Sequence, residues 1–231
     1  FPYTTLFRSG NMLSAETNDD LQELAQKIMP LLSEHSNNIT LNEKLFARVK
    51  EVYAQKESLQ LTQEQTRLLD DIYDSFVRHG ANLEGEAREQ YRQLTNELSK
   101  LTLDFSENNL KETNDYKLVI TDKSQLAGLP ESAVEAAAET AGEKGVEGWV
   151  FTLQAPSYGP FLTYADSRDL RRELYMAYNT KCTHDNASNN LEIVKKLANV
   201  RMEIAQLLGY DNFAEYNLQE RMAQNSESVY K

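Results

Sequence analysis

The sequence has few of the residues that build cross-linked or turn-rich folds. Its 231 residues include one cysteine, Cys182, so no disulfide bond can form within the chain, which suits a reducing compartment. The chain has only five prolines and nine glycines, and this scarcity favours helices over an all-β fold with many turns. No apolar run approaches the roughly 20 residues that a membrane-spanning helix needs.

Basic residues are outnumbered as well. The chain has 24 lysines and arginines against 36 aspartates and glutamates, which gives a formal net charge of −12. A surface of this sign repels phosphate backbones and anionic lipid headgroups, so we expect neither a nucleic acid nor a membrane as partner. With 40% hydrophobic and 26% charged residues, the composition is that of an ordinary globular protein.

The two ends of the chain differ in pattern from the rest. Residues 1–10 (FPYTTLFRSG) lack an initiator methionine and a signal-peptide pattern, and we interpret them as a non-native or disordered leader. Residues 11–231 are then predicted to form one helical lobe of a larger protein, truncated at its C-terminal end, because residues 226–231 resemble only the first turn of another helix. Cytoplasm is the predicted compartment, with periplasm as the alternative if a targeting signal preceded residue 11.

Apolar residues recur at the three- and four-residue spacing of a helix face along most of the chain. Capping boxes are predicted at residues 40–43 and 62–65, and the first box opens a helix with Leu45, Val49 and Val52 on its apolar face. Pro30 is expected to kink or shorten the first helix.

The predicted helices cover residues 17–34, a stretch through Val52, a stretch from residue 62 to Gly80, and residues 85–111, 131–141 and about 167–180. Residues 35–38 and 182–188 are expected to be loops, and 156–166 a mixed turn or short helix.

Residues 191–224 predict two helices joined by a tight corner. Apolar residues on the first helix step by four and three positions from Ile193 to Leu207, and Gly209 ends that helix because glycine tolerates a left-handed backbone. Asn212 is expected to cap the second helix, with Glu215 reaching back as in a capping box. The second helix is expected to continue through Met222.

Two short β-branched segments interrupt the helical pattern, at residues 117–121 and 149–153. Each is bounded by turn residues, and we expect the two to pair with each other. The predicted fold class is therefore mainly α, with many helices and one short two-stranded β-ribbon.

Three histidines invite a search for a metal site. His35, His79 and His184 all lie in predicted loops or at helix ends, and none belongs to an H-E-x-x-H sequence, which would place two imidazoles on one helix face. We interpret them as solvated or capping side chains. His184-Asp185 could be half of a site completed in space, although no second half is visible in the sequence.

Other candidate groups also have simpler explanations. Asp70, Asp71 and Asp74 could place two acids on one helix face, but an exposed acidic face is the favoured interpretation. Lys181 could lower the pKa of the Cys182 thiol, yet no base is readable beside it. Gly142, Gly145 and Gly148 lack the strand-then-helix setting of a phosphate loop. The aromatic segment Tyr158-Gly159-Pro160-Phe161 could line a groove, but such a segment more often packs over the edge of a core.

Several strings, in order, resemble the thimet oligopeptidase family of zinc metallopeptidases, and within it the bacterial peptidyl-dipeptidase (dipeptidyl carboxypeptidase) branch. The main string is RMEIAQLLGYDNFAEYNLQERMA at residues 201–223. The others are LNEKLFARV at 41–49, FVRHGA at 76–81, E-L-S-x-L-x-x-x-F-x-x-N at 97–108, LAGLP at 126–130, R-x-L-R at 168–171 and DN at 185–186. The resemblance covers residues 11–231 as an N-terminal portion.

The resemblance implies a two-lobed, mainly helical clam shell with a deep channel that admits short peptides. It implies that the full-length protein holds a zinc ion, that this ion activates a water molecule for attack on a peptide carbonyl, and that C-terminal dipeptides are released.

The zinc motif of the family has no counterpart here, so no catalytic or metal-binding residue is predicted in this chain, and its substrate-binding residues are unknown. Arg201, Glu203, Glu215 and Arg221 are predicted to do no chemistry. The missing C-terminal catalytic region is the expected partner. The alternative is a free-standing helical binding or scaffold domain without catalysis.

Overall fold

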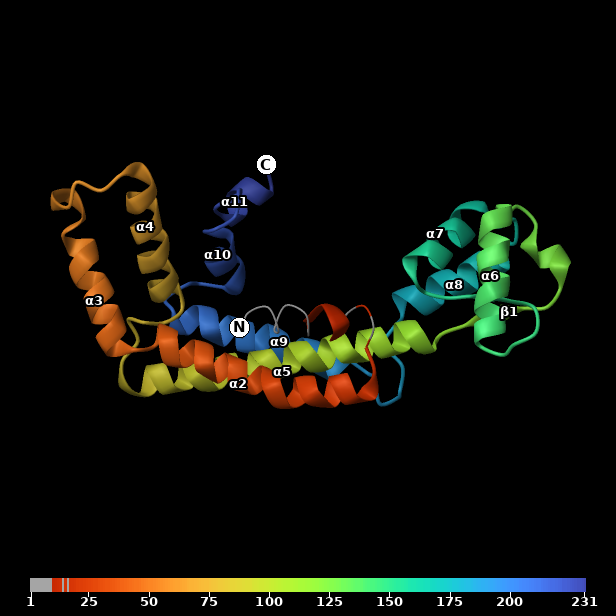
Figure 1. The fold of residues 1–231 in the computed structure, drawn as a ribbon, viewed down its shortest axis with the longest axis horizontal. Helices are drawn as coiled ribbons and strands as arrows, with labels where there is room; N and C mark the ends of the chain where they lie inside the picture. Colours follow the sequence, from red (N-terminus) through yellow and green to blue (C-terminus); the bar gives the residue numbers. More distant parts are fainter. Residues whose placement is uncertain (1–9, 14, 16) are drawn as a thin grey trace. The chain divides into compact units, whose positions relative to one another are not determined.

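The computed structural model describes residues 10–13, 15 and 17–231. The chain divides into two compact units. The first unit contains the residues up to Leu103 together with Val194–Lys231, and the second unit contains Asp104–Ile193. Apart from Gly10, the predicted leader lies outside the described residues. Element labels follow Figure 1, where they begin at α2.

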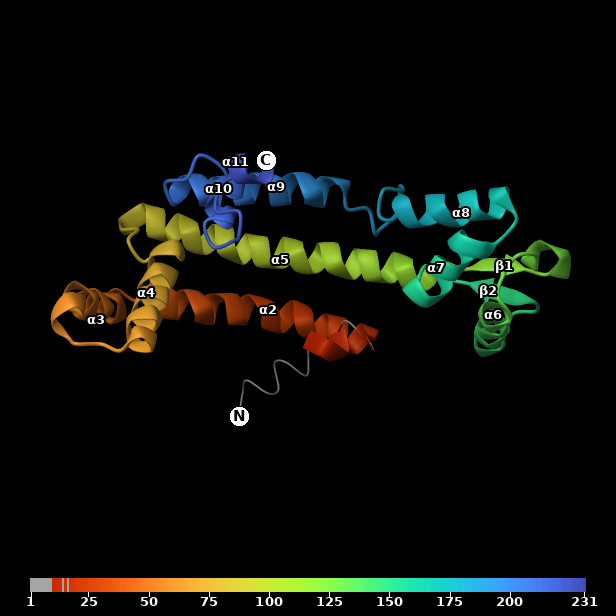
Figure 2. The ribbon, with the colours of Figure 1, turned by 90° about the horizontal axis from the view of Figure 1, so that it is seen from above.

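The described part of the first unit is helical throughout. Figures 1 and 2 show α2, α5 and α9 running alongside one another, with α3 and α4 paired as a hairpin. Tyr91, Leu94 and Leu101 of α5 are buried, and their spacing of three and seven residues places them on one face of the helix. Its elements are α2 (Asp19–Thr40), α3 (Glu43–Ala54), a 3-10 turn (Lys56–Ser58), α4 (Gln63–Arg78), the part of α5 (Gly85–Asp115) up to Leu103, α9 (Leu191–Leu207) from Val194, α10 (Phe213–Leu218) and α11 (Ser226–Val229).

The second unit contains the predicted β-ribbon. β1 (Leu118–Ile120) and β2 (Trp149–Phe151) pair antiparallel, with Leu118 opposite Phe151 and Ile120 opposite Trp149. Both strands lie inside the predicted ranges but are shorter, and the predicted fold class, mainly α with one two-stranded ribbon, is confirmed. The other elements are the end of α5, a 3-10 turn (Lys123–Leu126), α6 (Glu131–Glu143), α7 (Ala155–Tyr164) and α8 (Arg168–Asn179).

The core of the second unit lies around the ribbon, which Figure 2 shows between α6 and α8. Ile120 and Phe151 from the strands meet Phe161 of α7 and Leu174 of α8, and all four side chains are fully buried or nearly so. The rings of Phe151 and Phe161 meet edge to face, with centroids 4.5 Å apart. Burial of such large apolar side chains is the main favourable term in folding, so this cluster holds α6, α7 and α8 to the ribbon.

The α3–α4 hairpin confirms one predicted cap and corrects one predicted face. Thr62 and Gln65 form the predicted capping box at the start of α4. In α3, however, Phe46 is the buried residue, and it stacks on Tyr73 and Phe76 of α4. The predicted face was wrong, because Leu45 and Val52 are exposed. A phenyl ring buries more apolar surface than a leucine, so the ring sets the rotation of the helix.

The first helix is longer than predicted. α2 continues through Pro30 and through the predicted loop at residues 35–38, ending at Thr40. Asn37 is buried in its last turns and donates its amide to Thr95 Oγ1 of α5 at 2.9 Å, and Asn38 accepts from Arg92. These tertiary bonds satisfy side chains that would otherwise favour a turn. The predicted capping box at residues 40–43 was therefore wrong, because Asn42 caps α3.

The predicted corner after α9 is confirmed in its first half. Gly209 has a φ of +88°, and Asn212 caps α10 by accepting from the backbone N–H of Glu215. The predicted capping box also required the Glu215 carboxylate to accept from the backbone N–H of Asn212. That carboxylate instead accepts from the Ser226 hydroxyl. α10 ends at Leu218 rather than continuing, and Met222 is fully exposed.

Candidate functional site

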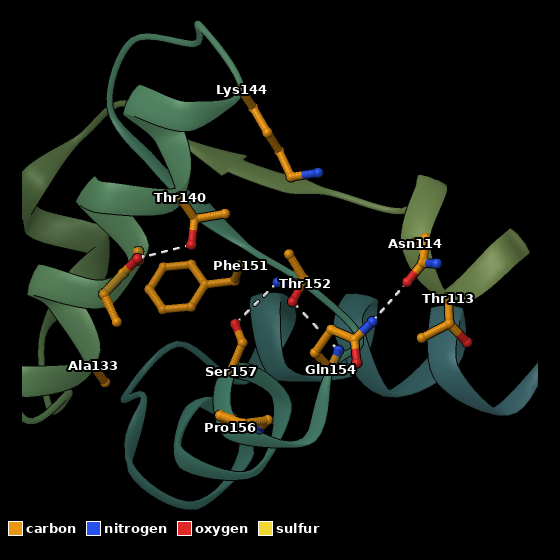
Figure 3. A pocket seen from close by; sticks show the side chains of 12 residues that line it. Thr113, Asn114, Ala133, Thr140, Lys144, Phe151, Thr152, Gln154, Pro156 and Ser157 are labelled. Carbon is orange, nitrogen blue, oxygen red and sulfur yellow. Dashed lines mark hydrogen bonds between the residues drawn. The ribbon is translucent and has the colours of Figure 1, made fainter. Parts of the chain in front are cut away.

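A cavity of about 420 Å³ opens in the second unit and is one of the candidate sites in the described part of the chain. Figure 3 shows it enclosed by one face of α6, the segment that follows β2, and the end of α5. Its volume lies within the range of small-molecule sites, about 300–1,000 Å³. The lining residues are Thr113, Asn114, Ala133, Ala136, Ala137, Thr140, Lys144, Phe151, Thr152, Gln154, Pro156 and Ser157.

The floor of the cavity is apolar because of the spacing on α6. Ala133, Ala137, Thr140 and Lys144 follow at intervals of four, three and four residues, so they share one helix face. The small side chains of the first three leave open space beside the ring of Phe151, which lies next to α6 in Figure 3. The sequence predicts this segment only as a helix over residues 131–141. The helical spacing of its small residues was the signal that could have revealed one wall.

Polar groups at the opposite side are held by local hydrogen bonds. The Ser157 hydroxyl accepts from the backbone N–H of Thr152 at 3.0 Å, and Thr152 Oγ1 accepts from the backbone N–H of Gln154 at 3.3 Å. The Gln154 amide donates to Asn114 Oδ1 at 2.7 Å, which ties the segment after β2 to the end of α5. These bonds fix the side chains of the rim before any ligand arrives.

A second polar depression lies near His184, where Glu112 of α5 organises the loop that follows α8. The Glu112 carboxylate accepts from the backbone N–H of Cys182 at 2.5 Å and from the Asn186 amide at 2.8 Å. Lys181 donates to Thr113 Oγ1 at 2.9 Å. Because both carboxylate oxygens of Glu112 already accept bonds from the loop, the residue holds the loop in place and is poorly suited to act as a base.

The three histidines belong to separate elements and are exposed. His35 is exposed in α2. His79 is the C-cap of α4, and its Nδ1 lies 2.6 Å from the carbonyl oxygen of Ser75. His184 is exposed beside Thr180, whose hydroxyl lies 3.3 Å from Nε2. Among the described residues, no group of three or more histidine, cysteine, aspartate or glutamate side chains could hold a metal ion.

The other candidates are also placed. Asp70 pairs with Lys56 at 2.6 Å and Asp71 with Arg67 at 2.9 Å, so these acids belong to ion pairs on the surface of α4. Gly142 lies in the last turn of α6, and Gly145 and Gly148 lie between α6 and β2, so the order of helix and strand is the reverse of that in a phosphate loop. The segment predicted as an aromatic loop, residues 158–161, is instead part of α7, because Phe161 is drawn into the core and Tyr158 stacks on Tyr178.

Two of the four polar residues of residues 201–223 that are predicted to do no chemistry make structural contacts. The guanidinium of Arg201 lies 5.5 Å from the ring centroid of Phe213. Glu215 accepts from Ser226, as described above. Glu203 and Arg221 are exposed. That none of the four takes part in chemistry stays a prediction.

The Cys182 thiol has a raised pKa. Burial is the main cause and the charge of Glu112 adds to it, so the lowering by Lys181 that was expected is outweighed. Since the thiolate is the reactive form, we expect iodoacetamide at pH 8 to modify folded Cys182 at least about tenfold more slowly than the same residue in urea. Mass spectrometry of timed samples measures both rates. Equal rates in the folded and unfolded chain would contradict this environment.

No helix among the described residues combines the length and the apolar character that a membrane crossing requires.

Comparison with known proteins assigns the chain to a family. Residues 161–231 match the sequence model of peptidase family M3. The chain is 33% identical over 220 residues to oligopeptidase A of Escherichia coli, and 34% identical over 219 residues to dipeptidyl carboxypeptidase of the same organism. Each alignment covers 94% of this chain and 32% of the relative. It is also 37% identical over 170 residues, 71% of this chain and 21% of the relative, to the organellar oligopeptidase A of Arabidopsis thaliana.

The chain thus spans about a third of the length of the curated bacterial relatives it matches. The aligned region includes most strings on which the resemblance was based, and the predicted recognition is confirmed. Relatives named as oligopeptidase A and as dipeptidyl carboxypeptidase match at nearly equal identity. The chain therefore belongs to peptidase family M3.

Proposed function

We propose that this chain is the N-terminal helical part of a longer zinc metallopeptidase that hydrolyses short peptides, and that it forms a wall of the substrate channel. The observation that carries the proposal is the alignment of 94% of the chain with an oligopeptidase A and a dipeptidyl carboxypeptidase of about three times its length. Release of C-terminal dipeptides is part of the proposal, by analogy with the second relative. Cytoplasm stays the predicted compartment.

The residues of this chain do not fit a zinc site. Three histidines lie on separate elements, and the sequence has no H-E-x-x-H string. Zinc in hydrolases needs about three nitrogen or carboxylate ligands converging on one point, and the described residues offer no such group. We therefore assign peptide hydrolysis and zinc binding to polypeptide outside this chain, and the contribution of this chain to shape and to substrate contacts.

The surface of the α3–α4 hairpin favours a part of a larger protein over a free-standing scaffold. Leu45 and Val52 of α3 and Leu68 and Ile72 of α4 are large apolar side chains that are exposed in the chain. Three of them immediately precede a ring that packs within the hairpin (Phe46, Tyr53 and Tyr73), and Leu68 precedes the half-buried Leu69, so in an antiparallel pair the four lie on the same side. Clusters of exposed apolar residues usually contact another surface, here the remainder of the peptidase.

The proposal is tested with the full-length gene product. The reading frame beyond codon 231 is expected to encode an H-E-x-x-H string, and the purified protein is expected to cleave short peptides with release of C-terminal dipeptides, identified by mass spectrometry. A chelator should abolish turnover and added zinc should restore it. A frame that continues for several hundred codons without the zinc motif, or a protein without peptidase activity, would refute the assignment.

A further inference from the structure

The cavity between α6, the segment after β2 and the end of α5 has an unusual balance of polar groups. Its lining, which consists of described residues, includes one cation, Lys144, and no carboxylate. Carboxylates outnumber cationic side chains by 36 to 24 in the whole chain, so the composition alone would lead us to expect carboxylates in the lining of this cavity. The electrostatic potential inside is expected to favour an anion.

The hydrogen bonds inside the cavity leave mainly donors free. The Ser157 and Thr152 oxygens each accept a backbone N–H, so their hydroxyl hydrogens point elsewhere and can be donated. Asn114 uses its carbonyl oxygen to accept from Gln154, which leaves the Asn114 amide hydrogens free in the bonds seen here. In Figure 3 the Lys144 side chain extends over the cavity toward the side on which Thr152 lies. Three neutral donors and one ammonium thus surround one space.

The apolar floor restricts what the anion can be attached to. Ala137 and Phe151 are buried beneath the cavity, whereas Lys144, Gln154 and Asn114 are exposed at its mouth. A ligand that fits this arrangement has a small apolar group on one side and an anionic group on the other. The cavity also lies at the first turn of α7, whose partial positive charge adds to that of Lys144.

We propose that this cavity binds the carboxylate end of a short peptide with a small apolar terminal residue, with the carboxylate near Lys144, Asn114 and Ser157 and the side chain on the alanine face of α6. The carboxylate chemistry follows from the donors of the cavity. The choice of a peptide as its source rests on the proposed function. The site holds a peptide end at the wall and takes no part in bond cleavage.

The experiment titrates the isotope-labelled 231-residue chain with N-acetyl-Ala-Ala and follows the backbone amide signals by NMR. We expect the signals of Thr152, Gln154 and Ser157 to shift with a saturable curve. The C-terminal amide of the same peptide should bind about tenfold more weakly, because it presents no negative charge to Lys144 and the neutral donors. Acetate tests the other source of a carboxylate, and it should bind still more weakly because it cannot reach the apolar floor.

Variants locate the binding. Lys144→Ala should weaken binding of the peptide acid about tenfold, Lys144→Arg should retain most of it, and Lys117→Ala, an exposed lysine of the same unit outside the cavity, should change nothing. Asn114→Asp keeps the shape and the acceptor for Gln154 but replaces a donor with a negative charge, so it should abolish binding.

Three outcomes would overturn the proposal: no saturable shift at the cavity, equal binding of the peptide acid and its amide, or equal effects of the alanine variants at residues 144 and 117. Binding of acetate as tightly as the peptide would overturn the choice of a peptide. None of these measurements needs catalysis, so a failure here is distinct from a failure of the full-length protein to hydrolyse peptides.

Discussion

Replacing Phe161 with alanine is expected to destabilise the second unit by about 3–5 kcal/mol. The side chain is 0% exposed and packs in the cluster formed by α7, the ribbon and α8. Its removal leaves a cavity lined by Phe151 and Leu174 and breaks the edge-to-face contact with the Phe151 ring. Because the surrounding elements come from four separate segments, they cannot collapse together to fill the space.

The single tryptophan of the chain gives a direct readout, because Trp149 lies in β2 and packs against the same core cluster. Urea unfolding followed by its fluorescence should show a midpoint shifted to markedly lower urea for Phe161→Ala. Phe105→Ala is the matched control in the same unit, since that side chain is 37% exposed, and it should cost less than about 1 kcal/mol. Equal shifts for the two variants would mean that Phe161 is not in the core.

Replacing Arg78 with alanine is expected to cost about 2–3 kcal/mol in the first unit and to release α10 from α4. The buried Arg78 guanidinium donates to the carbonyl oxygen of Tyr216 at 2.9 Å and to Gln219 Oε1 at 3.1 Å. It also pairs with Glu220 at 2.9 Å and lies 4.4 Å from the Tyr216 ring centroid. The Glu220 side chain is 61% exposed, so water replaces the lost partner there, and the cost stays below that of a fully buried pair.

Hydrogen exchange of the α10 backbone amides measures this release, because those amides should exchange faster once the helix is no longer held. Arg67→Ala on the same helix is the control. Its side chain is 79% exposed and pairs with Asp71 on the surface, so little change is expected. Arg78→Lys keeps the charge but not the planar donor fork and should fall between the two. Unchanged protection of α10 in Arg78→Ala would contradict the docking role.

The Arg78 contacts also show what the recognised strings do in the fold. Arg78 lies in the FVRHGA string, while its three partners lie in residues 201–223, about 140 positions away. Asn108 at the end of another string donates to Asn190 at 2.8 Å, and the backbone of Ala127 in LAGLP accepts from Asp166 at 2.9 Å. The strings that identify the family thus fall at long-range contacts of the fold.

Several predictions that depend on residues close together in the sequence were correct. The capping box at Thr62, the cap at Asn212 and the end of α9 at Gly209 depend on residues within a few positions of each other, and each is found in the structure. The two strands were also predictable, because β-branched runs between turn residues have few alternatives. Their pairing followed because the sequence offered no other strand.

The predictions were wrong where tertiary contacts determine the secondary structure or the buried face of a helix. The loop predicted at residues 35–38 is helical because Asn37 and Asn38 find partners on α5, far away in the sequence. Phe46 rather than Leu45 faces α4 because its ring stacks on the rings of Tyr73 and Phe76 of that helix. The candidate cavity could not be predicted either, since its lining comes from residues 113–114, 133–144 and 151–157.

The central claim is that this chain supplies structure and substrate contacts to a peptidase whose zinc site lies elsewhere in a longer polypeptide. Zinc content and peptide turnover, measured side by side for the 231-residue chain and the full-length protein, test it most directly. The account predicts zinc and cleavage for the full-length protein, and neither stoichiometric zinc nor cleavage for the chain alone. Chelator-sensitive hydrolysis of the same peptide by the purified 231-residue chain would contradict it.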